Sequence, residues 1–136
     1  MYLLDTNVVS ELRRTRPHGA VIAWLASVAE RELAVSAVTL GEIQAGIEIT
    51  RTNDAARAEE LEAWADAVEA TQAVIPMDAR VFRRWARLMA GRPDDLYEDA
   101  MIAATALEHG LTVVTRNVRD FEGFGVPTLN PFEPVR

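Results

Sequence analysis

Four acidic side chains of this chain lie either just after an apolar run or in the first turn of a helical segment. They are Asp5, Glu42, Asp99 and Asp120. Asp5 ends the apolar run 1–4, and a short run that turns directly into a helical pattern is typical of a buried parallel strand. Because open α/β sheets bind ligands beyond the carboxyl ends of their strands, we predict that the four acids lie along one rim of a sheet.

Two of these acids also have a purely structural explanation. Asp5, or Thr6 beside it, would cap the helix that follows. Glu42 lies three residues after Thr39, which is the spacing of a capping box in which the Glu side chain reaches back to the backbone of the cap residue. Both interpretations still place the carboxylate at the same end of the sheet.

Asp99 is harder to explain by local structure. It lies at the margin of an apolar helical stripe, where a carboxylate needs a partner or costs several kcal/mol. The stripe is formed by Leu96, Ala100, Ala103 and Leu107. Asp120 and Asn117 follow the apolar run 111–115, and turn chemistry is their structural alternative, because Asx side chains bond to nearby backbone amides.

Several carboxylates on one rim, with no lysine in the chain, would repel each other unless a cation lies among them. Hard oxygen ligands, without cysteine and without histidine near these acids, favour Mg²⁺ or Mn²⁺ over zinc. We therefore predict a divalent-metal site.

Length and composition restrict the class of protein further. A chain of 136 residues is long enough for one domain, predicted over 1–136. All 14 basic residues are arginine, which excludes P-loop phosphate binding, Schiff-base chemistry and receiver-type phosphoaspartate signalling, since each needs a lysine. The absence of cysteine, of a secretory signal and of a long apolar run predicts a cytoplasmic protein with no membrane segment.

Apolar runs alternate with helical patterns along the whole chain. Strands are predicted at 1–4, 33–38, 73–76, 111–115 and 126–129, and helices at 7–14, 18–30, 39–50, 55–71, 79–90 and 96–109. This alternation predicts an α/β fold, a three-layer α/β/α sandwich around a central, mainly parallel sheet. Pro76 indicates that the third strand lies near an edge of that sheet or ends there.

Several motifs, in this order, resemble those of PIN-domain ribonucleases, of the toxin type found in bacterial VapBC and FitAB-like toxin–antitoxin pairs. The motifs are Leu3-Leu4-Asp5-Thr6-Asn7-Val8-Val9-Ser10-Glu11, Ser36-Ala37-Val38-Thr39-Leu40-Gly41-Glu42, Asp99-Ala100-Met101-Ile102-Ala103-Ala104-Thr105-Ala106, Thr115-Arg116-Asn117-Val118-Arg119-Asp120-Phe121 and the ending Asn130-Pro131-Phe132. Together they span nearly the whole chain.

The resemblance implies metal-assisted hydrolysis of RNA phosphodiester bonds, with acidic metal ligands corresponding to Asp5, Glu42 and Asp99. The fourth acid of the family varies in position. Some members have it where this chain has Asn117, and others pair an Asn there with an Asp three residues later, so Asp120 is the better candidate. Asn117 would then orient Asp120 or a bound water, and the hydroxyls of Thr6 and Thr115 are expected behind the ligands.

A net charge of −7 means that any contact with RNA is local. The candidates for phosphate contacts are Arg13, Arg14, Arg16, Arg116 and Arg119; a solvated helix face or salt bridges to a partner explain them as well. The resemblance further implies a homodimer, and a small antitoxin whose segment enters the acidic groove with an arginine.

The main alternative is a catalytically degenerate PIN-fold module that only binds other proteins, which the amide at Asn117 would favour. A haloacid-dehalogenase-type phosphatase is excluded by Asn7, which occupies the position of its second Asp, and by the absence of lysine.

Overall fold

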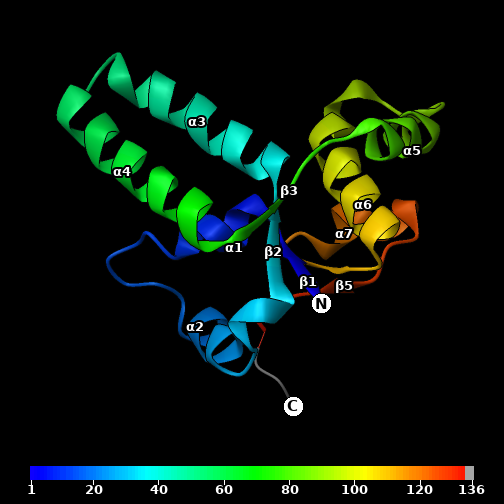
Figure 1. Ribbon diagram of the computed structural model, residues 1–136, viewed down its shortest axis with the longest axis horizontal. Helices are drawn as coiled ribbons and strands as arrows, with labels where there is room; N and C mark the ends of the chain where they lie inside the picture. The colour runs from blue at the N-terminus through cyan, green and yellow to red at the C-terminus, as the bar shows by residue number, and fades with distance from the viewer. Residues whose placement is uncertain (134–136) are drawn as a thin grey trace.

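Five strands form one parallel sheet in the computed structural model, which describes residues 1–133. The strands are β1 (Tyr2–Leu4), β2 (Leu33–Ser36), β3 (Ala73–Ile75), β4 (Thr112–Val114) and β5 (Thr128–Leu129), in the spatial order β3-β2-β1-β4-β5 (Figure 1). The predicted parallel sheet is confirmed, and so is the edge position of the strand before Pro76.

Helices cover both faces of the sheet. They are α1 (Thr6–Glu11), α2 (Gly19–Ala26), α3 (Ala37–Arg51), α4 (Ala55–Thr71), α5 (Ala79–Met89), α6 (Tyr97–His109) and α7 (Val118–Phe121). In Figure 1 the α3–α4 hairpin lies on one side of the central strands, and α5, α6 and α7 lie on the other. This arrangement confirms the predicted three-layer α/β/α architecture. Within residues 1–133, no helix is long and apolar enough to cross a membrane.

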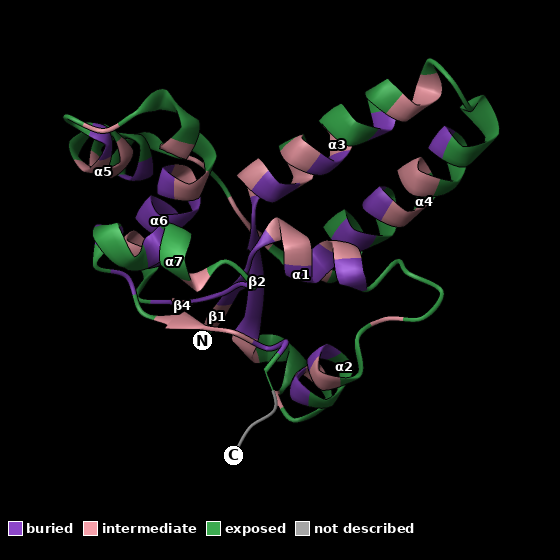
Figure 2. Cartoon of the chain, turned by 180° about the vertical axis from the view of Figure 1, so that it is seen from behind, coloured by how far each residue is buried: buried purple, intermediate pink, exposed green. Residues whose placement is uncertain are grey.

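The alternation of side chains along the strands divides the core into two halves. Leu4 and its register partners Val35 and Val114 pack with helices α1 to α4. Leu3 and its partners Ala34 and Val113 pack on the opposite face. Figure 2 shows these strands buried between the helical layers. Each central strand is therefore apolar on both faces, which explains the uninterrupted apolar runs in the sequence.

The parallel register brings the carboxyl ends of β1, β2 and β4 to one edge of the sheet. Leu4 lies beside both Val35 and Val114, so the residues that follow these strands, Asp5 and Thr115 among them, leave the sheet at the same level. The local prediction for Asp5 is also confirmed, because its Oδ1 accepts a hydrogen bond from the Thr6 amide (2.8 Å) and it is the N-cap of α1.

The predicted capping box of Thr39 and Glu42 is wrong. Strand β2 ends at Ser36 rather than at Val38, and the Ser36 hydroxyl caps α3 by accepting a hydrogen bond from the Val38 amide (3.1 Å). Helix α3 therefore begins two residues earlier than predicted. Glu42 then lies in the second turn of the helix, where its side chain is not needed for capping and is available to the sheet edge.

Candidate active site

Asp5 lies at the centre of the rim and is held entirely by neutral donors. Its side chain is 6% exposed. Oδ2 accepts hydrogen bonds from the Thr115 hydroxyl (2.8 Å) and from Nδ2 of Asn7 (3.1 Å), and Oδ1 accepts one from the Thr6 amide. No described basic side chain forms a salt bridge with Asp5, so its charge is not neutralised within residues 1–133.

A network around Asn7 joins the ends of β1 and β4. Asn7 donates to Asp5, and its Oδ1 accepts from the Arg116 amide (3.2 Å). The Thr115 hydroxyl accepts from the Asn117 amide (3.0 Å) while donating to Asp5. The carboxylate orientation is therefore fixed by two segments more than 100 residues apart in sequence.

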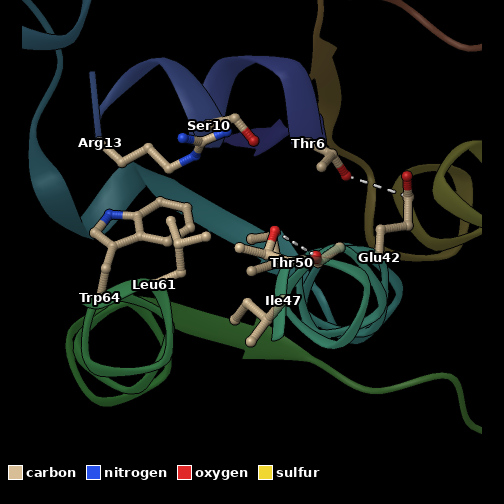
Figure 3. Close-up of a pocket in the computed structure, with 10 residues that line it drawn as sticks. Thr6, Ser10, Arg13, Glu42, Ile47, Thr50, Leu61 and Trp64 are labelled. Carbon is tan, nitrogen blue, oxygen red and sulfur yellow. Dashed lines mark hydrogen bonds between the residues drawn. The ribbon is translucent and has the colours of Figure 1, made fainter. Parts of the chain in front are cut away.

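Glu42 reaches the same rim from α3. The Thr6 hydroxyl lies 3.2 Å from Oε1 of Glu42 (Figure 3). It also lies 3.1 Å from the hydroxyl of Thr39. Glu42 is half-buried and Thr39 is fully buried. Thr6 and Thr115, the two hydroxyls expected behind the acids, thus contact Glu42 and Asp5 respectively.

Asp99 and Asp120 complete the set from the other side of the sheet. Asp99 is half-buried in the first turn of α6, where the helix dipole favours an acid, and Asp120 is exposed on α7. Asn117 contributes its backbone to the network: its amide donates to Thr115 and its carbonyl accepts from the Asp120 amide (3.0 Å).

The acids raise the pKa values of one another. Burial raises the pKa of Asp5, and the charge of Asp120 adds to this increase, while the hydrogen bonds from Thr115, Thr6 and Asn7 lower it. Burial raises the pKa of Asp99 to about 6, with the charges of Asp5 and Asp120 as further causes. All these shifts follow from acidic groups that share a poorly solvated rim.

The pKa of Glu42 is raised as well. Burial, the charge of Glu98 and a hydrogen bond shared with the Glu98 side chain raise the pKa of Glu42 to about 7, against the effect of the Thr6 hydroxyl. The charge of Asp5 is a smaller contribution in the same direction.

These carboxylates do not form a closed ligand cage. Among residues 1–133, no three His, Asp or Glu side chains lie close enough to hold one metal ion. The donor set nonetheless fits a hard divalent cation, because it consists of carboxylate and hydroxyl oxygens. None of the described arginines forms a salt bridge with these carboxylates, so their negative charge is not compensated.

Three of the five predicted RNA-contacting arginines meet beside the rim. Arg13, Arg14 and Arg116 line one surface hollow of about 430 Å³ together with Asn7. A second groove of about 250 Å³ runs between α1, α3 and α4, and Figure 3 shows Arg13 and the Thr6–Glu42 pair at opposite ends of it.

The arginines differ in what restrains them. The Arg116 guanidinium lies 4.5 Å from the centre of the Phe132 ring, and Arg14 pairs with Glu11 (3.5 Å). Arg119 lines a neighbouring hollow with Asp120, and Arg16 is exposed on the loop between α1 and α2.

Three residues of this region were not predicted as site residues from the sequence. Asn7 links Asp5 to β4, and Glu98 acts on Glu42 and Asp99. Glu11 is 6% exposed and accepts a hydrogen bond from the His18 amide (2.7 Å), which anchors the arginine-bearing loop 12–18. The repeated pattern of an Asx or Glu side chain just beyond a strand end pointed to Asn7, but nothing in the sequence pointed to the other two.

A model of the PIN domain family matches residues 2–125. The chain belongs to the PIN-domain family. It is 35% identical to VapC ribonuclease Y4jK of Sinorhizobium fredii, over 99% of this chain and 100% of the relative. It is 33% identical to Toxin FitB of Neisseria gonorrhoeae, over 97% of this chain and 99% of the relative. The crystal structure of FitAcB from Neisseria gonorrhoeae superposes with a TM-score of 0.81 and 30% identity, covering 98% of this chain and 99% of that chain.

This PIN domain matches these relatives over almost their full length, so the resemblance to VapC- and FitB-like toxins is confirmed. The match includes every segment that contributes an acid to the rim.

Proposed function

We propose that this PIN domain is a ribonuclease toxin that hydrolyses RNA phosphodiester bonds with a bound Mg²⁺ or Mn²⁺. The observation that carries the proposal is the set of acids at the carboxyl ends of the strands, which raise the pKa values of one another and have no arginine partner among residues 1–133. The likeness to a VapC ribonuclease over the whole chain supports the same activity.

The metal would be held by Asp5, Glu42, Asp99 and Asp120. When bound, a divalent ion polarises the phosphate and lowers the pKa of a coordinated water. Burial is the main cause of the raised pKa values of Asp5 and Asp99, and the charges of neighbouring acids add to it. A bound cation would relieve that repulsion, which supports the assignment.

The neighbouring side chains position these acids. Hydrogen bonds from Thr115 and Asn7 fix the orientation of the Asp5 carboxylate. The hydrogen bond from the Thr6 hydroxyl orients the carboxylate of Glu42. Asn117, whose amide completes the Thr115 contact, supports the β4 side of the rim next to Asp120. A carboxylate with one restrained oxygen can accept a hydrogen bond from an attacking water and hold it in line with the phosphorus.

The RNA would approach across the arginines beside the rim, because the chain as a whole carries a charge of −7. Arg13, Arg14 and Arg116 line one hollow with Asn7, and Arg119 lines a second hollow with Asp120, which supports a role for these arginines in phosphate contacts. Arg16 extends the first group along the exposed loop.

We further propose that a small antitoxin neutralises this protein, as the resemblance to VapBC- and FitAB-like toxin–antitoxin pairs implies; the likeness to Toxin FitB supports the toxin role. The groove between α1, α3 and α4 ends at Glu42, so a segment bound there could direct an arginine to the acids. A homodimer remains a prediction from the family.

The test is cleavage of a single-stranded RNA by purified, antitoxin-free protein with Mg²⁺ or Mn²⁺. We expect cutting that a chelator abolishes and that Asp99→Asn lowers at least 100-fold, since it removes a charged metal ligand. Asp66→Asn, an exposed acid on α4, is the matched control and should cut as the wild type does.

A folded protein that cuts no RNA with either metal would instead support the degenerate binding module. Equal cutting by Asp99→Asn and Asp66→Asn would assign the activity to a contaminant or to another site.

A further inference from the structure

Helix α5 carries a row of four arginines that the acidic rim does not explain. Its sequence, Ala-Arg-Val-Phe-Arg-Arg-Trp-Ala-Arg-Leu-Met, contains 4 of the 14 arginines in the chain and no acid. The spacing i, i+3, i+4, i+7 places these side chains on one face of the helix, along about 10 Å of its axis. The row consists of Arg80, Arg83, Arg84 and Arg87.

One acid from the neighbouring helix organises this row. Glu108 of α6 binds Nε of Arg84 through Oε1 (2.7 Å) and a terminal nitrogen of Arg80 through Oε2 (3.2 Å). The Glu108 side chain is only 11% exposed, whereas that of Arg80 is 81% exposed. Glu108 therefore lies beneath the row, and the guanidinium groups lie above it.

The charge of this surface is not balanced by its surroundings. Arg83 and Arg87 are exposed and form no salt bridge within residues 1–133. Together with Glu108 and Ala79, the four arginines line a hollow of about 300 Å³. Four positive charges over one carboxylate give this hollow a local charge of about +3, in a chain whose net charge is −7.

The chemistry of the hollow suits the backbone of a nucleic-acid duplex. It has no aromatic lining residue on which an unpaired base could stack, which is how single strands are usually held. A row about 10 Å long spans roughly three phosphates of one strand of a B-form DNA duplex, at about 3.4 Å of axis for each. It spans a comparable number in the more compact A-form duplex of RNA. Planar guanidiniums are well matched to phosphate oxygens.

We propose that the α5 arginine row binds the phosphodiester backbone of a double-helical segment of the RNA substrate, outside the acidic rim. This inference rests on the proposed nuclease function. Glu108 is nine residues from Asp99 along α6, about 13 Å of helix, so the row contacts a part of the RNA that is separate from the cleaved phosphate.

The experiment measures binding of a 20-base-pair RNA duplex between 50 and 200 mM salt, in an Asp99→Asn background that prevents cleavage. The test variant is Arg83→Gln/Arg87→Gln, which leaves the Glu108 pairs intact. The control is Arg31→Gln/Arg57→Gln, which removes the same charge from other exposed positions. Thermal unfolding verifies that all variants are folded.

We expect the test variant to bind the duplex about eightfold more weakly at 0.1 M salt for each arginine–phosphate pair that the substitutions remove. The slope of log K against log salt should also fall by about 0.9 for each such pair. The control should change neither quantity. The same measurement with a DNA duplex of equal sequence distinguishes the two sources of the backbone, and weaker binding of DNA would assign the row to RNA.

Identical affinity and slope for test and control variants would overturn the inference. Unchanged duplex binding together with a loss of antitoxin binding in the test variant would also overturn it. That result would assign the arginine row to an acidic protein partner. Cleavage of the short single-stranded RNA does not involve α5, so its failure affects only the proposed nuclease function.

Discussion

The two ends of α6 carry acids in opposite electrostatic surroundings. Asp99, in the first turn, is half-buried, pairs with no described arginine, and has a pKa raised to about 6 by burial and by the charges of other acids. Glu108, in the last turn, is bound by Arg84 and Arg80, and the hydrogen bond from Arg84 lowers its pKa.

The difference shows that Glu108 has its charge neutralised by described arginines and that Asp99 does not. The charge of Glu108 is neutralised by the protein itself, so Glu108 can serve as a fixed support for α5. The charge of Asp99 is opposed by burial and by its neighbours, so an ionised Asp99 is stabilised only by something that the chain does not supply. Groups perturbed in this way are concentrated at functional sites.

The same contrast extends across the rim. Asp5 is as poorly exposed as Glu108, yet it is held by Thr115, Asn7 and the Thr6 amide, which donate hydrogen bonds without bringing a positive charge. Neutral donors orient a carboxylate but leave its charge available to a cation, whereas an arginine would occupy the oxygens that a metal needs.

Among the changes that test this contrast, removal of one neutral hydrogen-bond donor to Asp5 should have the largest effect on cleavage. Thr115→Val keeps the β-branched shape of the residue that follows β4 but removes the hydroxyl that donates to Asp5 at 2.8 Å. We expect cleavage to fall about 10- to 100-fold, as for other residues that orient metal ligands. The free energy of unfolding should fall by about 1–2 kcal/mol, because a buried carboxylate loses a hydrogen bond.

Thr105→Val is the matched control for that variant. Thr105 is equally buried, but its hydroxyl donates to the Met101 carbonyl within α6. Its removal should leave the cleavage rate unchanged. Equal loss of activity in the two variants would mean that packing, rather than the orientation of Asp5, limits the reaction.

A divalent cation should stabilise the folded protein, and this effect should depend on Asp99 and not on Glu108. At ten times its dissociation constant, Mg²⁺ or Mn²⁺ adds about 1.4 kcal/mol to the free energy of unfolding, which is about 5 °C in Tm for a chain of this length. Asp99→Asn should abolish this shift in a thermal-unfolding measurement. Glu108→Gln should retain it, and loss of the shift in both variants would break the comparison.

The positions of Asp5 and Asp120 along the chain could be predicted from sequence because each follows an apolar run, whereas Asp99 has no such local signal. An apolar run marks a buried strand, and the parallel register of β1, β2 and β4 then brings the strand ends together. The boundary of α3 could not be predicted in the same way. Ser36 and Thr39 are both good caps, and Ala37 and Val38 fit a strand or a helix equally well. Pairing of Ser36 with Ile75 of β3 fixes the end of β2.

The partners of the acids could not be predicted, because they are distant in sequence. Asn7 contacts Thr115 across 108 positions, and Glu98 meets Glu42 only when α6 and α3 are placed on opposite sides of one sheet edge. A single sequence shows the chemical type of such residues but not the side chain that they face.

The last comparison concerns the pH dependence of stability in the absence of metal. The pKa of Glu42 is about 7 in the folded protein against 4.5 ordinarily, so the folded state binds more protons in this range, and stability should fall as the pH rises from about 4.5 to 7. Glu42→Gln should flatten that fall.

Glu108 should behave in the opposite way. Its pKa is lowered on folding, so its contribution is present at neutral pH and is lost as the pH falls below about 4.5. Glu108→Gln should therefore be less stable than the wild type at pH 7, and the two should converge in acid. Urea unfolding at a series of pH values, with a chelator present, measures both variants. If Glu42→Gln and Glu108→Gln changed the pH dependence of stability in the same way, the two acids would have the same kind of environment. The absence of an arginine partner would then no longer distinguish Glu42 from Glu108.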